Sequence, residues 1–139
     1  MTSRTINLNS LINGTVDCSN SVLVTGNLDC SNNITSLTGL KVKCKDISSN
    51  YTILTKDNIV YVDTTTATGN IIITLPLAST VDKQIFYIVD GTGNCINNNI
   101  QINVSGSDTI NGDTSLLMNI NFMSIRLLAR SSNNSYIVI

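Results

Sequence analysis

The sequence contains no histidine, no tryptophan and no glutamate, and alanine and glutamine are rare among its 139 residues. Without histidine, the usual general base at neutral pH and the commonest metal ligand are both missing. The scarcity of alanine, glutamate and glutamine leaves few strong helix formers. These absences argue against an enzyme, against a metal or cofactor site, and against a helical fold.

Charged side chains are also few, because they make up 12% of the chain and the net charge is −1. No basic field exists to collect nucleic acid, and with aromatic residues at 4% there is no platform on which bases could stack. The longest apolar run, Ile85 to Val89, falls far short of the roughly 20 residues that a membrane-spanning helix needs. The N-terminal residues lack the charged-then-apolar pattern of a secretion signal. We therefore expect no nucleic-acid partner, no membrane insertion, and assembly in a cytoplasm.

Threonine, serine, isoleucine, valine and asparagine are abundant instead, and they predict an all-β protein with many turns. Short segments that alternate apolar and polar residues, or are wholly apolar, are separated by turn residues. The strands predicted in this way are Ile59–Asp63, Asn70–Leu75, Ile85–Asp90, Ile100–Val104, Leu116–Phe122, Ser124–Ala129 and Tyr136–Ile139. The continuous run Ile85–Val89 is expected at the centre of a sheet, covered on both faces. Together these strands predict a compact β-sandwich or barrel-like domain over residues 51–139.

The first 48 residues carry an internal repeat. The heptapeptide Gly14–Asn20 returns as Gly26–Asn32 with the shared pattern Gly-x-x-Asp-Cys-Ser-Asn, and a looser copy starts at Gly39. Each unit is too short to bury a core alone, so it must stack on neighbours in the same chain or in sister chains. Chance similarity in a sequence rich in Asn, Ser and Gly is the alternative. The repeat predicts a repeat-like β segment over residues 1–48.

Several motifs of the second half follow one another in a characteristic order and spacing. They are Tyr51-Thr-Ile-Leu, Val60-Tyr-Val-Asp63, Ile73-Thr-Leu-Pro76, Phe86-Tyr-Ile-Val-Asp90, Asn99-Ile-Gln-Ile, Gly106-Ser-Asp-Thr-Ile-Asn-Gly112, Ser124-Ile-Arg-Leu-Leu and Tyr136-Ile-Val-Ile139. In these motifs the chain resembles the C-terminal β-domain of bacteriophage tail fibres and tail spikes and of surface proteins of large DNA viruses. The first 48 residues resemble the Gly-Asn-Leu-x-Val repeats of fibre shafts, which implies a β shaft or docking arm over residues 1–48. Two departures stand out, because Cys18 and Cys30 replace the usual Val, Ser or Thr, and Ser135 replaces a common Trp.

This resemblance implies a non-enzymatic virion structural protein, a homotrimeric fibre, spike or capsomer cap on the particle surface. Its shaft strands would wind around a threefold axis that the C-terminal domain caps. Its implied partners are sister chains, other capsid or fibre proteins, and a host surface glycan or receptor. The alternative is a carbohydrate-binding β-sandwich module without catalysis, whose mark would be exposed aromatic side chains. A cellular adhesin is a third reading, which the missing signal pattern disfavours.

The candidate site residues are cysteines and lysines. Cys18, Cys30 and Cys44 occur once per repeat, with no Cys-x-x-Cys pair and no histidine to complete a zinc site or activate a thiol. They are interpreted as small packing residues near a trimer axis, with interchain disulfides as the alternative. Cys95 falls in a turn and is a candidate free thiol.

Lys41, Lys43 and Lys45 alternate and would share one face of a strand. Such a ladder could hold an anionic glycan or an acidic neighbour, but we favour charges that protect an edge strand from unwanted pairing. Asp90, Asp108 and Asp113 lie near turns and invite a calcium interpretation. Their spacing fits no known calcium loop, so capping of their own turn amides is favoured.

Overall fold

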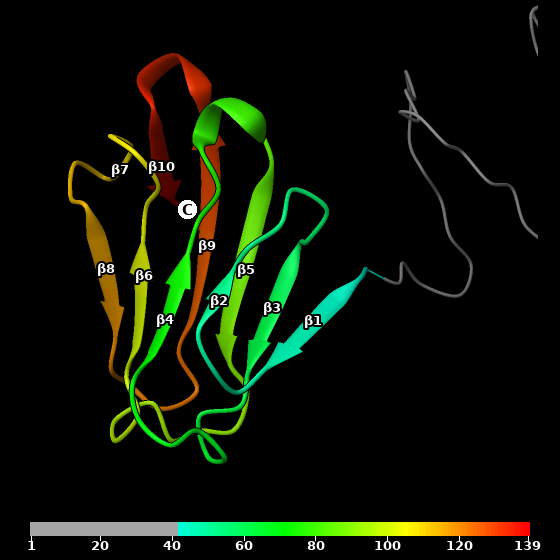
Figure 1. Cartoon of the computed structure of the whole chain (residues 1–139), viewed down its shortest axis with the longest axis vertical. Coiled ribbons are helices and arrows are strands. Elements are labelled where there is room, and N and C mark those ends of the chain that lie inside the picture. Colours follow the sequence, from blue (N-terminus) through cyan, green and yellow to red (C-terminus); the bar gives the residue numbers. More distant parts are fainter. Residues whose placement is uncertain (1–41) are drawn as a thin grey trace, which may run out of the picture. The chain divides into compact units, whose positions relative to one another are not determined.

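Apolar side chains that alternate along the strands of residues 42–139, the part of the chain that the structure describes, point into the space between two β-sheets. In this computed structural model the six-stranded sheet has the order β1-β3-β5-β9-β10-β7, and the four-stranded sheet has the order β2-β4-β6-β8 (Figure 1). The strands are β1 (Cys44–Ile47), β2 (Tyr51–Thr52), β3 (Ile59–Val62), β4 (Ile71–Thr74), β5 (Ile85–Asp90), β6 (Ile100–Asn103), β7 (Thr109–Ile110), β8 (Ser115–Met118), β9 (Ser124–Arg130) and β10 (Ser135–Val138). Helical geometry in these residues is limited to two 3₁₀ turns, η1 (Ala78–Thr80) and η2 (Ser131–Asn133). The predicted all-β fold is confirmed for residues 42–139.

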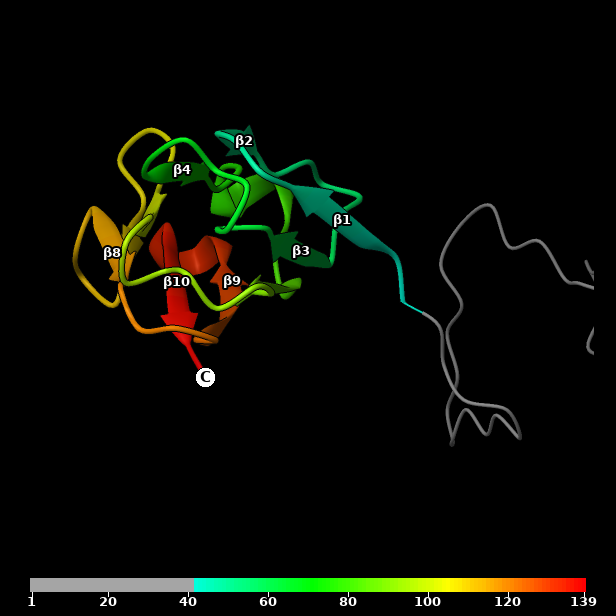
Figure 2. The ribbon, with the colours of Figure 1, turned by 90° about the horizontal axis from the view of Figure 1, so that it is seen from below.

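The first six strands form three successive coils, and each coil contributes one strand to each of the two sheets. β1, β3 and β5 run parallel in the six-stranded sheet, and β2, β4 and β6 run parallel in the four-stranded sheet. The chain then reverses, since β8 pairs antiparallel with β6, and β9 pairs antiparallel with β5. The predicted two-layer architecture therefore arises from a parallel winding that antiparallel strands close. Figure 2 shows this arrangement along the strands, from the end that is lowest in Figure 1.

The core lies between the two sheets, and isoleucine is its commonest residue. Phe86 and Ile88 of β5 are fully buried, and Tyr136 of β10 packs on Phe86 with ring centroids 6.3 Å apart. The Tyr136 hydroxyl donates a hydrogen bond to the carbonyl oxygen of Pro76 at 2.7 Å, which satisfies its polar end. Each large apolar side chain buried in this way stabilises the fold by about 1.5–3 kcal/mol. These contacts fix the strand register on which both outer faces depend.

The prediction that the run Ile85–Val89 is covered on both faces is wrong for this domain. β5 lies inside the six-stranded sheet, but only Phe86 and Ile88 point into the core. Tyr87 is 38% exposed, and Ile85 and Val89 are half-buried. The apolar run therefore supplies one side of the core and, on its other side, an apolar surface.

The strand predicted for Leu116–Phe122 is also wrong in its second half. β8 ends at Met118, and the next residues form a turn in which the Met123 amide donates to the Ile120 carbonyl at 3.1 Å. Ile120 and Phe122 continue the apolar alternation, yet both are largely exposed. Their side chains belong to the end of the domain and not to its core.

The domain begins earlier than the predicted boundary between residues 48 and 51. Cys44 to Ile47 form β1, whose register with β3 runs from Cys44 opposite Ile59 to Ile47 opposite Val62. β1 therefore belongs to the same two-sheet domain as the later strands. The remaining part of the predicted shaft or arm lies outside the described residues.

Candidate interaction surfaces

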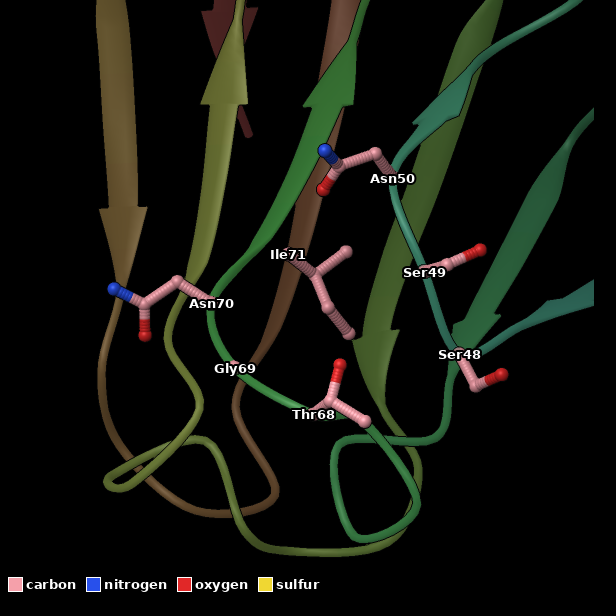
Figure 3. Close-up of a pocket in the computed structure, with 7 residues that line it drawn as sticks. All are labelled: Ser48, Ser49, Asn50, Thr68, Gly69, Asn70 and Ile71. Carbon is pink, nitrogen blue, oxygen red and sulfur yellow. The ribbon is translucent and has the colours of Figure 1, made fainter.

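Two shallow depressions mark the domain where the chain passes from one sheet to the other. The first has a volume of about 360 Å³ (Figure 3) and is lined by Ser48, Ser49, Asn50, Thr68, Gly69, Asn70 and Ile71. Two of its amides already serve the fold. The Asn50 side-chain oxygen accepts the Ile72 amide at 2.8 Å, and that of Asn70 accepts the Asn99 amide at 3.0 Å. Its lining carries hydroxyls and amides but no titratable group, so it offers no acid–base chemistry.

The second depression, of about 340 Å³, is lined by Asp46, Ile47, Ser48, Tyr61 and Asp63. Hydrogen bonds from the amide and hydroxyl of Thr66, together with those from Thr92 and Thr65, lower the pKa of Asp63 below its usual range, despite some desolvation. This carboxylate is therefore ionised and engaged in its own turn.

A third surface feature is the side of the six-stranded sheet that faces away from the core. The side chains that define this outer apolar face are Ile59, Tyr61, Ile85, Tyr87, Val89, Leu128 and Ile137. Its continuity follows from the register, because Leu128 lies opposite both Ile85 on β5 and Ile137 on β10. In the next row Tyr87 lies between Ile59 on β3 and Arg126 on β9. The face therefore spans β3, β5, β9 and β10, and the same side of β9 also carries two cations, Arg126 and Arg130.

The outer side of the four-stranded sheet has a different composition. Its residues are Thr52, Ile72, Thr74, Gln101, Asn103, Ser115 and Leu117, of which five are polar. Gln101 and Asn103 also bond to each other through their amide side chains at 3.0 Å. The apolar surface of the sandwich is thus concentrated on one of its two sides.

Tyr61 is held in place within the outer apolar face. Its hydroxyl donates to the Gly91 carbonyl oxygen at 2.7 Å, and its ring lies so close to Gly91 that a Cβ there would overlap the ring. A side chain already fixed in one conformation loses little entropy when a partner covers it. The face is therefore partly preorganised for contact.

The predicted lysine ladder is only partly present. β1 begins at Cys44, so Lys45 lies on the strand, Lys43 precedes it, and Lys41 lies outside the described residues. β1 is an edge strand, and the Lys45 ammonium lies 5.6 Å from the Tyr51 ring centroid, a cation–π distance. This position agrees with the edge-protecting interpretation of Lys45. An anionic contact of these lysines stays a prediction.

The two cysteines within residues 42–139 are both free thiols, but their surroundings differ. Cys44 is exposed on β1, whereas Cys95 is fully buried and donates to the Met118 carbonyl at 2.9 Å. Burial raises the pKa of the Cys95 thiol, which makes it a packing residue and not a reactive one. Cys18 and Cys30 lie outside the described residues, so the predicted trimer-axis role of Cys18, Cys30 and Cys44 stays a prediction.

Asp90 caps its own turn, as the sequence predicted. Its carboxylate is 1% exposed and accepts the Thr64 hydroxyl at 2.6 Å and the amides of Gly93, Cys95 and Phe122 at 3.0, 3.2 and 2.9 Å. Asp108 behaves differently, because it accepts the amide of Ala78, a residue far from its own turn, at 2.7 Å. Among residues 42–139, no cluster of three candidate metal-ligating side chains is found. These aspartates organise loops, and their geometry gives no support to the calcium interpretation.

Comparison of the sequence with models of known protein families and with curated proteins gives no match. None of the helical segments in residues 42–139 is long and apolar enough to span a membrane. The function is therefore argued from the surfaces themselves.

Proposed function

We propose that this protein is a non-enzymatic structural component of a virus particle surface, a homotrimeric fibre, spike or capsomer cap that contacts other particle proteins and the host cell. The observation that carries the proposal is the outer apolar face, which no other part of residues 42–139 covers. Contiguous apolar surface of this kind marks an interaction site more often than a solvated surface. Sister chains that packed there would remove it from water.

The pattern of β5 supports the same conclusion. A continuous apolar run such as Ile85–Val89 is typical of a strand buried on both faces. Within residues 42–139 only one face is fully buried, because Tyr87 is exposed and its neighbours Ile85 and Val89 are half-buried. A second copy packed on the outer apolar face would give β5 the double cover that its sequence indicates.

The proposal is tested by measuring the molar mass of the full chain by light scattering after size exclusion. We expect three times the chain mass of 14.9 kDa. A trimer that survives denaturant only without reductant would assign the cysteines an interchain role. A mass of one or two chains would overturn the homotrimer.

Two matched variants locate the contact. Tyr87→Lys places a cation on the outer apolar face beside Arg126, where burial of unpaired charge opposes association. Ile72→Lys is the control, because Ile72 is 39% exposed, close to the 38% of Tyr87, but lies on the four-stranded sheet. We expect Tyr87→Lys to give monomers and Ile72→Lys to stay trimeric. Equal behaviour of the two variants would show that the trimer contact lies elsewhere.

A further inference from the structure

One end of the sandwich carries exposed apolar side chains among amides. This loop tip consists of residues 91–99, between β5 and β6, and residues 119–123, between β8 and β9, and it faces the viewer in Figure 2. The two loops are joined by a hydrogen bond of 2.9 Å from the Ile96 amide to the Asn121 side-chain oxygen. Ile96, Ile120 and Phe122 are all largely exposed here, and Phe122 is the most exposed at 71%.

Phe122 is held in an unusual way for an exposed aromatic residue. Its φ of +60° lies in the left-handed region, which a bulky side chain enters only against steric resistance. Its amide is fixed by the buried Asp90 carboxylate at 2.9 Å, and its ring lies against Gly93, where a Cβ would overlap the ring. The backbone is therefore strained at a residue whose ring is exposed to solvent. Strain of this kind clusters at functional sites.

The side chains of the two loops around the ring are uncharged, and most are polar. Asp63 of the β3–β4 loop, whose carboxylate accepts the Thr92 hydroxyl at 3.1 Å, is a charged neighbour of the tip. Asn97, Asn119 and Asn121 are exposed on the same two loops, and their amide groups can both donate and accept hydrogen bonds. The bonds formed within the tip use only one group of Asn97, which donates to Asn94 at 2.7 Å, and one of Asn121. Residues 91–99 and 119–123 contain no charged side chain. Buried Asp90 faces inward and has four donors of its own.

We infer that the loop tip is a binding site for a neutral glycan, with Phe122 as the platform for one sugar ring. The weakly positive C–H groups on one face of a sugar complement the negative face of an aromatic ring. The sugar's hydroxyl groups, which both donate and accept, match the surrounding amides. An acidic sugar would find no cation here. The inference deepens the proposed host contact, although glycan binding at this site does not depend on trimerisation.

The test is a glycan array that pairs neutral glycans with their sialylated or sulfated forms, probed with the full chain. We expect binding to neutral members and none that depends on the acidic group. Phe122→Gly removes the ring while keeping a residue that adopts positive φ readily. We expect it to weaken the apparent affinity for the selected glycan at least tenfold, whereas Leu117→Ala, an exposed apolar change on β8, leaves it unchanged.

The outcomes separate this inference from the structural proposal. The array samples and a light-scattering sample come from one preparation, so a chain that binds neutral glycan as a monomer keeps the site and loses the trimer. No binding by the wild type, binding only to acidic glycans, or equal binding by Phe122→Gly would each overturn the glycan site. Adhesion of the wild type only to phosphatidylcholine vesicles would assign the exposed tip to a lipid surface instead.

Discussion

At the scale of single residues, Asp90 does the most to organise the loop tip. Its carboxylate joins Thr64 of the β3–β4 loop, Gly93 of the β5–β6 loop and Phe122 of the β8–β9 loop. Burial raises the pKa of this carboxyl. The hydrogen bonds from Thr64 and from the amides of Phe122, Gly93 and Cys95 lower the pKa, and together they outweigh burial. The net pKa lies below the ordinary 3.8, so the ionised form stabilises the fold.

Asp90→Asn should therefore destabilise the domain by about 2–4 kcal/mol, because an amide group replaces an acceptor that faces buried donors.

The depressed pKa of Asp90 also sets the sign of the pH effect on stability. The stability that ionised Asp90 gives is complete above the unfolded value of 3.8 and is lost as the pH falls through the lower folded value. Denaturant unfolding of wild type and variant between neutral and strongly acidic pH should show the difference between them shrinking in acid. Asp46→Asn, an exposed change on β1, is the charge-matched control. A constant difference at every pH would contradict this role.

Phe122 and Phe86 should respond in opposite ways to truncation. Phe122→Gly relieves a left-handed conformation that costs a non-glycine residue about 1–2 kcal/mol, and it adds about 0.5–1 kcal/mol of backbone entropy to the unfolded chain. We expect its free energy of unfolding to stay within about 1 kcal/mol of the wild type. Phe86→Ala, in the core, should cost about 3–5 kcal/mol. Both values come from the same denaturant titration, and a large loss for Phe122→Gly would mean that its ring supports the fold.

At the scale of strands, the sequence pattern predicted where strands begin and end better than it predicted whether their apolar side chains face the core or solvent. Ile85–Asp90 was predicted with its observed bounds, and Ile100–Val104 is one residue longer than β6. The same alternation failed at Ile120 and Phe122, because a period of two cannot show whether the apolar side faces a core or solvent. β2 and β7 have two residues each, too few to show any period. The site residue Phe122 was therefore placed in a strand, although its asparagine neighbours were a turn signal.

Strand position also predicts unequal local stability. β5 has hydrogen-bonded neighbours on both sides, whereas β1 has one neighbour and a mostly exposed set of side chains. Amides that are poorly covered open by local fluctuations that cost far less than global unfolding. We expect the amides of β1 to exchange with deuterium much faster than those of β5, as measured by mass spectrometry on the peptides that contain them. Equal protection would contradict this expectation and mean that a further segment, of this chain or of another, covers β1 in solution.

At the scale of the whole domain, the sequence could not reveal how the strands pair. Short strands between turns predict two layers equally well for antiparallel and parallel winding. Strand pairing is set by the loops that carry the chain between the sheets. β3 pairs with β5, and β4, which lies between them in the sequence, belongs to the other sheet. The outer apolar face was hidden for the same reason, since Tyr87 and Leu128 become neighbours of one surface only when β5 and β9 pair.

The two ends of this winding are not equivalent. At one side the chain passes directly from β7 in one sheet to β8 in the other, with a bridge between Ile110 and Asp113 in the connection, and this closes the stack. At the other side β1 is the last strand of its sheet within residues 42–139, and its outer edge is unpaired there. Within residues 42–139 the architecture thus has one closed end and one open edge, which gives it a direction of growth. Evolution could lengthen it by duplicating coils ahead of β1 without disturbing the closed end or the surfaces near it.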